Sequence, residues 1–289
     1  MKPASFEYFR PRTTDEVLAL LQAHGSDAKL LAGGQSLIPA MNFRLATPSV
    51  LIDLNAVDQL SYISDDADGV RIGAMTRQRT VERSTSVART APLITETMPF
   101  VAHAAIRNRG TVGGSLAHAD PAAELPAVMM ALNSIFAIRA PGGVRSVSAD
   151  DFFVGLFATA IEPGELLEEV RVPKTVGRRG FAFQEISRRH GDFALVGVAA
   201  SVCLDDKGRC SDARIALLSV GDRPVLAMKA AGVLHGQTPG ADVIRAAADA
   251  AATGDIDPPS DIHASAKYRR QLARVLTRRV LERAFERAL

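Results

Sequence analysis

Two glycine pairs, each flanked by small polar residues, are the parts of this sequence best suited to binding chemistry. The first lies in residues 32–36 (AGGQS) and the second, about eighty residues later, in residues 111–115 (TVGGS). Because glycine has no Cβ, backbone N–H groups at such turns can approach a phosphate, and successive N–H groups form an anion-binding nest. Either loop alone is better explained as a tight turn. The pair, with matching polar flanks, favours a ligand that carries a pyrophosphate.

A carboxylate follows the second loop, in the segment AHADPAAELP. Asp120 and Pro121 predict a turn and a helix start, with Pro121 at the first helical position. Glu124 would then lie in the first turn, where a negative charge complements the helix dipole. On chemistry alone, stabilising the helix and accepting hydrogen bonds from a nucleotide ribose are equally good roles for Glu124.

No other pattern of catalytic or metal-binding residues occurs in the sequence. It lacks the G-x-G-x-x-G, P-loop, H-E-x-x-H, C-x-x-C and G-x-S-x-G motifs. Its six histidines have no metal-ligand spacing, and two cysteines are too few for a structural zinc site or an iron–sulfur cluster. Cys203 and Cys210 lie near a predicted hairpin turn, where reduced thiols are favoured over a disulfide. We therefore expect no catalytic residue and no metal site in this chain.

The composition is that of an ordinary globular protein. Of the 289 residues 47% are hydrophobic and 23% charged, and the net charge of +2 gives no strong field to attract nucleic acid or a membrane. The longest weakly polar stretch, residues 125–138, is shorter than the roughly 20 residues of a membrane span. The arginine-rich C-terminal segment has few aromatic residues near it to stack on bases. With no signal-peptide pattern at the N-terminus, we expect a soluble, cytoplasmic protein without a nucleic-acid partner.

The first glycine loop is predicted to follow a strand in a small unit of helices and strands. A helix is expected to begin at Thr13 or Thr14 as N-cap and to end at Gly25 as C-cap. A short buried strand at residues 28–33 leads into the loop. A second strand, with apolar residues alternating against polar ones, follows at residues 49–57.

The rest of the chain is predicted to form two further units. Hairpins are expected at residues 60–76 and 134–153, and a strand at 164–173, while prolines divide the region between the hairpins into short helices. A basic, glycine-containing joint at residues 174–180 is a candidate domain boundary. Three antiparallel strands and then helices follow it. The predicted units are residues 1–57, 58–176 and 177–289.

Four segments together resemble the medium, FAD-binding subunit of the molybdenum hydroxylases: AGGQSLIP, TVGGSLAHADPAAELPA, GELLEEVRVP and RRHGDFALV. That family includes carbon monoxide dehydrogenase, nicotine dehydrogenase, caffeine dehydrogenase and the flavin domain of xanthine dehydrogenase. The resemblance extends in register from residue 1 to about residue 285. It implies an α+β chain: a vanillyl-alcohol-oxidase-type FAD-binding fold in two subdomains, then a small α+β domain around a three-stranded antiparallel sheet.

The resemblance also implies cofactor contacts by position. Glu124 takes the place of an acidic residue, and Leu167 that of an apolar contact at the isoalloxazine ring. Phe193 falls where carbon monoxide dehydrogenase has a tyrosine, so only packing is expected there, and Gln184 lies near the place of a lysine in xanthine dehydrogenase. The expected FAD contacts are Leu31, Ala32, Gly33, Gly34, Gln35, Ser36, Leu37, Thr111, Val112, Gly113, Gly114, Ser115, Glu124, Leu167 and Phe193.

The function implied by the resemblance is electron transfer. FAD in this chain would receive electrons from the [2Fe–2S] clusters of a small partner subunit and deliver them to an external acceptor. A large partner subunit would hold the molybdenum cofactor and oxidise the substrate, and the assembly would be a dimer of heterotrimers. Two alternatives remain. One is a self-sufficient flavin-dependent dehydrogenase or oxidase of the same fold, which would need a substrate-binding cap. The other is a scaffold subunit that has lost FAD, against which the intact glycine loops count.

Overall fold

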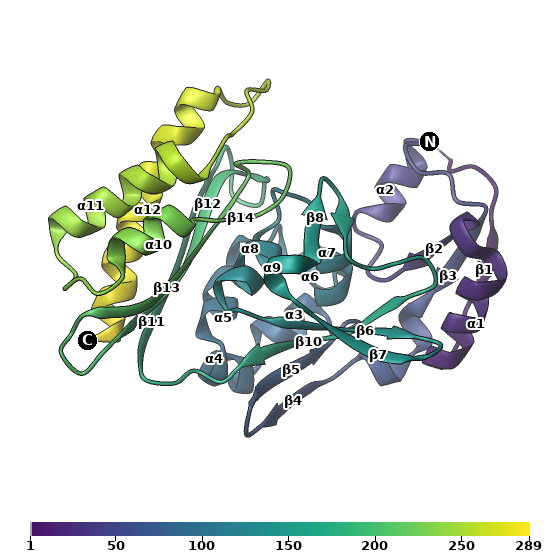
Figure 1. Ribbon diagram of the computed structural model, residues 1–289. Coiled ribbons are helices and arrows are strands. Elements are labelled where there is room, and N and C mark those ends of the chain that lie inside the picture. Colours follow the sequence, from purple (N-terminus) through teal and green to yellow (C-terminus); the bar gives the residue numbers. More distant parts are fainter. Residues whose placement is uncertain (1) are drawn as a thin grey trace.

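The N-terminal part of the protein is a parallel sheet that leads directly into the first glycine loop. The computed structural model describes residues 2–289 (Figure 1). The strands lie in the order β1 (Glu7–Phe9), β3 (Val50–Asp53), β2 (Ala28–Leu31), and α1 (Thr14–His24) and α2 (Leu37–Asn42) supply the crossovers that parallel strands require. β1 was not predicted, because it has only three residues. Two of them are exposed, so the sequence shows no hydrophobic alternation there.

The predicted ends of α1 are confirmed. The Thr13 hydroxyl accepts a hydrogen bond from the Glu16 N–H at 3.2 Å, and Gly25 follows the helix with a φ of 51°, a conformation that glycine adopts at little cost. Val17 and Leu21 of the helix pack with Ile52 of β3 in one buried cluster. Short 3-10 turns complete this part of the chain at Gly25–Asp27, Leu54–Ala56 and Asp58–Leu60.

The middle of the chain is a five-stranded antiparallel sheet with short helices packed on it. Its order is β4 (Ile63–Asp66), β5 (Gly69–Gly73), β10 (Leu166–Pro173), β6 (Ile135–Ala140), β7 (Gly143–Ser148). Both predicted hairpins and the strand that ends at Pro173 are confirmed. The other elements are α3 (Gln78–Glu82), α4 (Thr85–Thr90), α5 (Pro92–Thr97), a 3-10 turn (Met98–Phe100), α6 (Ala104–Arg107), α7 (Val112–His118), α8 (Glu124–Ala131), α9 (Ala149–Phe152), β8 (Phe153–Gly155) and β9 (Ala158–Thr159).

The helix after the second glycine loop begins later than the sequence predicts. Pro121 is not its first residue, because Asp120 Oδ1 accepts a hydrogen bond from the Ala122 N–H at 2.9 Å and forms a local turn. An aspartate that bonds the backbone two residues on competes with helix formation. α8 therefore starts at Glu124, which still lies in the first turn.

The C-terminal part is an antiparallel sheet whose two faces pack against different partners (Figure 1). β11 (Arg178–Ser187), β12 (Ala194–Leu204) and β13 (Cys210–Leu218) are the three predicted strands, and a fourth, β14 (Val225–Leu226), is only two residues long. One face packs on α10 (Met228–Leu234), α11 (Ala241–Ala250), its π-helical extension (Ala251–Asp255) and α12 (Ala266–Ala288). The other face shares a core with α8 and the five-stranded sheet.

Among residues 2–289, no helix combines the length and the apolar character needed to cross a membrane. Within the same range, no cluster of three or more His, Cys, Asp or Glu side chains is arranged to hold a metal ion. Cys203 and Cys210, on the neighbouring strands β12 and β13, are free thiols.

Candidate functional site

The first glycine loop leaves successive backbone donors open. It joins β2 to α2, with Gly34 in the left-handed region at a φ of 73°. The structure gives the N–H groups of Gly34, Gln35 and Ser36 no acceptor among residues 2–289. The Gln35 side chain folds back and donates from Nε2 to the Gly33 carbonyl at 3.2 Å. Successive open N–H groups form a nest for an anion, so the loop is built as a phosphate contact requires.

The second predicted glycine loop is not a loop in the structure, because its residues 112–115 form the start of helix α7 and their backbone donors are used within the protein. Residues 111–115 keep the name second glycine loop. The Gly113 N–H donates to the Ala74 carbonyl at 2.8 Å, and the Gly114 N–H donates to Thr111 Oγ1 at 3.0 Å. Thr111 is thereby the N-cap of α7. This loop is suited to close packing, with the half-buried Ser115 hydroxyl as an additional donor.

The two loops touch through their glycines. A Cβ placed on Gly33 would lie 2.5 Å from the carbonyl oxygen of Arg109 and 2.8 Å from Gly110 Cα, and one on Gly114 would lie 3.3 Å from Ala32 Cβ. No other residue type allows such an approach at Gly33. The structure therefore brings together two loops that lie about eighty residues apart in the sequence.

Asn55 and Arg77 tie the loops together, and neither was predicted as a site residue. Asn55 Nδ2 donates to the Ala32 carbonyl at 3.0 Å, and its Oδ1 accepts from the Arg77 guanidinium at 2.6 Å. The same guanidinium donates to the Arg109 carbonyl. Burial, and next the positive charge of Arg109, lower the pKa of Arg77, and Asn55 connects the Arg77 guanidinium to the first loop. The one sequence signal for Asn55 was its polar place in the alternating strand at residues 49–57.

Glu124 lies at the buried start of α8, with 7% of its surface exposed. Burial raises the pKa of its carboxyl to about 7. A hydrogen bond from its own backbone N–H opposes this rise, the charge of Asp120 adds to it, and the charge of Arg107 lowers the pKa. The turn before α8 is attached to the C-terminal sheet, because the Ser219 N–H donates to the Pro121 carbonyl at 2.8 Å. Glu124 thus lies where α8, the helix that follows α7, meets the C-terminal sheet.

The two apolar contacts predicted for the flavin ring lie in different settings. Leu167 on β10 is 4% exposed and belongs to the core shared by both parts of the molecule. Phe193, one residue before β12, is 68% exposed. Leu167 is thus buried within the protein and Phe193 lies at its surface, and both stay predicted contacts of the flavin ring.

Gln184, which lies near the place of a lysine in xanthine dehydrogenase, and its neighbour Glu185 lie on opposite faces of the C-terminal sheet. Ala182 and Ile186 pack in the core formed with the C-terminal helices, and Gln184 shares their face by the two-residue period of a strand. Phe183 belongs to the other core, so Glu185 lies on the sheet face that packs against α5 and α8. No local sequence signal marks Glu185, because β11 also carries the polar residues Arg178, Arg179 and Gln184.

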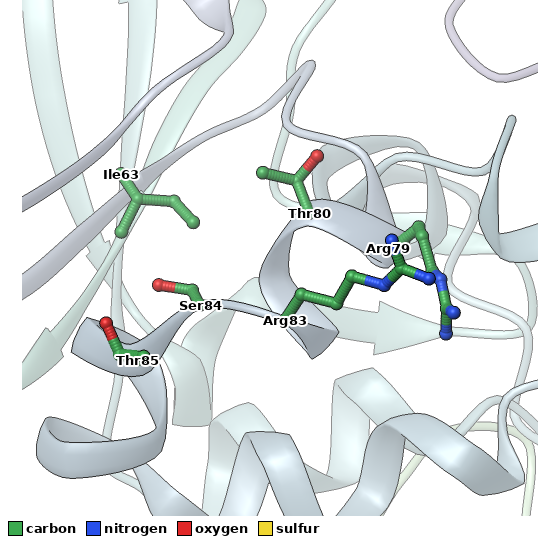
Figure 2. A pocket seen from close by; sticks show the side chains of 6 residues that line it. All are labelled: Ile63, Arg79, Thr80, Arg83, Ser84 and Thr85. Atoms are coloured by element: carbon green, nitrogen blue, oxygen red, sulfur yellow. The ribbon is translucent and has the colours of Figure 1, made fainter.

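A hollow of about 510 Å³ lies away from the predicted contacts. It is lined by Ile63, Arg79, Thr80, Arg83, Ser84 and Thr85 (Figure 2). Arg79 is already paired with Glu82 at 2.7 Å, and none of the residues predicted to bind a cofactor lines this hollow. The candidate site is therefore the pair of glycine loops, together with the place where the start of α8 meets the C-terminal sheet.

Two family models cover almost the whole chain. The model described as the FAD binding domain in molybdopterin dehydrogenase matches residues 4–175, and the CO dehydrogenase flavoprotein C-terminal domain matches residues 181–284. The chain belongs to this flavoprotein family. The resemblance inferred from the glycine loops and the α+β fold class are thus confirmed, and the chain is a flavoprotein of the molybdopterin dehydrogenases.

Individual relatives match over their full length. Subunit alpha of the 6-hydroxypseudooxynicotine dehydrogenase complex of Paenarthrobacter nicotinovorans is 43% identical over 288 residues, which cover 100% of this chain and 97% of the relative. The carbon monoxide dehydrogenase medium chain of Afipia carboxidovorans is 40% identical over 291 residues, covering 100% and 99%. In a solved carbon monoxide dehydrogenase from Hydrogenophaga pseudoflava the matching chain has a TM-score of 0.96 at 38% identity, covering 99% of both chains. The relatives are medium chains or subunits of dehydrogenase complexes.

The residues present fit the FAD that defines the family. Open N–H groups at residues 34–36 suit a pyrophosphate, and the positive charge of Arg77, which Asn55 connects to the first loop, complements the charge of that group. The glycine contacts bring both loops to the same place without a Cβ between them. The free ring of Phe193 is available to a flat aromatic group.

Proposed function

We propose that this chain is the electron-transfer subunit of a molybdenum hydroxylase complex, placed between an iron–sulfur partner and an external electron acceptor. The observation that carries the proposal is the open nest at Gly34, Gln35 and Ser36, packed against the second glycine loop. Bound FAD supplies the redox chemistry, and the protein supplies binding, orientation and electrostatics. The partners are a small [2Fe–2S] subunit and a large molybdopterin subunit, in a dimer of heterotrimers.

Each part of the site has a defined role in this proposal. The nest binds the pyrophosphate, and Gly33 and Gly114 permit the close approach of the backbone to it. Thr111 fixes the second loop by capping α7. Glu124 accepts hydrogen bonds from ribose hydroxyls, and Phe193 covers one face of the flavin ring. Because only electrons are transferred here, no side chain of this chain acts as a catalytic acid, base or nucleophile.

The test compares the purified chain with and without its partner subunits. We expect the chain to carry FAD, seen in its absorbance spectrum, and to be reduced by dithionite but not by any organic substrate of the complex. Addition of both partner subunits should make the same flavin reducible by substrate. Substrate-dependent bleaching in the chain alone would instead support a self-sufficient flavoenzyme. Absence of flavin in the chain and in the complex would support a scaffold subunit.

A further inference from the structure

The loop between β11 and β12, residues 188–193, packs its backbone directly on the imidazole ring of His103. A Cβ placed on Gly191 would lie 2.3 Å from His103 Cε1 and 2.7 Å from each ring nitrogen, so no side chain fits between the two residues. Gly191 also has a φ of 85°, a conformation that glycine adopts at little cost. The ring of His190 lies edge-on to that of His103, with 6.1 Å between the ring centroids. The loop is therefore shaped to fit His103.

His103 is held in place by a buried ion pair. It is the N-cap residue of α6, but its side chain makes no capping hydrogen bond, so the ring is free to pack. The carbonyls of Val101 and Ala102, directly before it, accept hydrogen bonds from the Arg107 guanidinium at 2.9 Å and 3.2 Å. Arg107 is 7% exposed and is bonded to Glu82 at 3.0 Å and 3.1 Å. The turn that carries His103 is thus fixed from inside the protein.

The other end of the same segment meets the first glycine loop. The N–H groups of Arg109 and Gly110 both donate to the Ile106 carbonyl, at 3.0 Å and 2.7 Å. The Arg109 carbonyl oxygen is the atom that a Cβ on Gly33 would meet at 2.5 Å. His103 and the contact with Gly33 therefore lie at the two ends of one short, internally bonded segment, residues 103–110.

Polar bonds do not attach the loop to the FAD-binding domain, which the family model places at residues 4–175. Arg188 Nη1 lies 2.9 Å from His263 Nδ1, which belongs to the C-terminal part. Among residues 2–289, no hydrogen bond or ion pair joins residues 188–193 to the FAD-binding domain. Packing therefore relates the loop to that domain, and His103 is the packing partner of the loop's glycine.

We propose that His103 is a positioning residue for Phe193: through its contact with Gly191, it holds the loop where Phe193 covers the flavin ring. Phe193 follows Gly191 by two residues and is 68% exposed, so little packing of its own fixes its place. An exposed loop with few buried contacts opens easily unless something holds it. The inference rests on the proposed function, because it takes Phe193 as the residue that covers the flavin.

Limited digestion of the full-length chain by trypsin tests whether His103 holds the loop. Trypsin cleaves after exposed arginines, and the loop offers Arg188 and Arg189. His103→Ala should speed cleavage there at least about twofold, the factor that corresponds to about 0.5 kcal/mol at the lower end of couplings between residues in contact. His103→Gln, which keeps a planar group of similar length, should largely restore slow cleavage. His235→Ala, at an exposed histidine after α10, is the matched control and should cleave as the unmodified chain does.

Reoxidation of the dithionite-reduced, FAD-loaded chain, followed by stopped flow, tests whether the loop acts on the flavin. His103→Ala should speed reoxidation, as Phe193→Ala does, but should add nothing in the Phe193→Ala background, because both changes act through the same ring. His103→Gln should restore most of the original rate, and His235→Ala should leave it unchanged.

A change in only one of the two measurements for His103→Ala, or in neither, would overturn the proposal. Additive effects of His103→Ala and Phe193→Ala on reoxidation would also overturn it, because His103 would then act on the flavin independently of Phe193. Absence of flavin from the unmodified chain would instead overturn the proposed function, and digestion of that flavin-free chain would still decide whether His103 holds the loop.

Discussion

Gly33 lies directly against the carbonyl oxygen of Arg109, closer than any residue with a Cβ can approach. This contact joins the first glycine loop to Arg109 and Gly110, directly before the second glycine loop. Gly33→Ala is therefore expected to push the loops apart, to lower the free energy of unfolding by about 1–3 kcal/mol, and to lower the FAD content. Urea unfolding and the ratio of flavin to protein absorbance measure both effects.

Gly142→Ala is the matched control for that substitution. Gly142 lies at the tip of the β6–β7 hairpin, where an added Cβ meets no atom within 4 Å. Its stability and flavin content should not change. Full flavin content in purified Gly33→Ala would mean that close contact of the loops is not needed to bind FAD.

The Thr111 hydroxyl holds the start of α7 by accepting the Gly114 N–H. Thr111→Val keeps the shape of the side chain but removes the acceptor, so a loss of about 1 kcal/mol in the free energy of unfolding is expected, together with weaker FAD retention. Thr111→Ser, which keeps the hydroxyl, should retain most of both. A larger loss in Thr111→Ser than in Thr111→Val would show that the methyl group, rather than the cap, matters at this position.

Arg77 donates hydrogen bonds to Asn55 and to the Arg109 carbonyl, so it links three segments of the site. Arg77→Met is expected to cost about 1.5–3 kcal/mol of stability, the range for hydrogen bonds that involve a charged group, and to reduce FAD affinity. Arg83→Met, at an exposed arginine on the surface hollow, is the control. Equal FAD affinity in the two variants would remove Arg77 from the site.

Phe193 is largely exposed, so its removal should leave the stability within about 0.5 kcal/mol of the original. FAD binding should nevertheless weaken by about 0.5–1.5 kcal/mol in Phe193→Ala, the usual contribution of an aromatic pair beyond area burial. Reoxidation of the dithionite-reduced protein, followed by stopped flow, should become faster because one face of the flavin is uncovered. Ile262→Ala, at another exposed apolar residue, should change neither quantity. Unchanged reoxidation and FAD retention in Phe193→Ala would place the ring elsewhere.

The stability of the FAD-free protein should fall as the pH rises from about 4.5 to about 8. The pKa of Glu124 is raised to about 7 and that of Glu185 to about 8 from an ordinary value of 4.5. Between these values the folded state binds more protons than the unfolded state, so the free energy of unfolding decreases with increasing pH. Melting temperatures measured across this range should show the decrease, and Glu185→Gln should reduce it. A flat profile in the unmodified chain would mean that both carboxylates keep ordinary pKa values.

Features set by neighbouring residues could be predicted from the sequence. The Thr13 cap, the Gly25 end of α1 and both hairpins depend on local backbone preferences, and all are confirmed. The predicted start of α8 at Pro121 was wrong, because the Asx turn at Asp120 competes with the helix that Pro121 favours. The two glycine loops were recognisable individually, and the structure shows that they meet.

The residues that connect those loops could not be predicted. Asn55 bonds Ala32 across 23 positions, and Arg77 bonds Asn55 across 22, and nothing in the local sequence of either residue identifies its partner. Glu185 is similar, because its pKa is raised by burial and by the charge of Glu124, which lies about sixty positions away in the sequence. Long-range polar contacts of this kind are decided by tertiary packing, which no local pattern records.

The core that joins Phe183, Ala199 and Leu218 of the C-terminal sheet to Leu125 and Val128 of α8 determines how this protein can be divided. The two family models meet near residues 175–181, but the buried apolar surface continues across that boundary. A fragment cut there would expose one whole face of β12, whose residues are buried almost throughout, and exposed apolar surface of that extent promotes aggregation. Fragments for expression, fusions and subunit exchange must therefore keep the sheet and α8 in the same polypeptide.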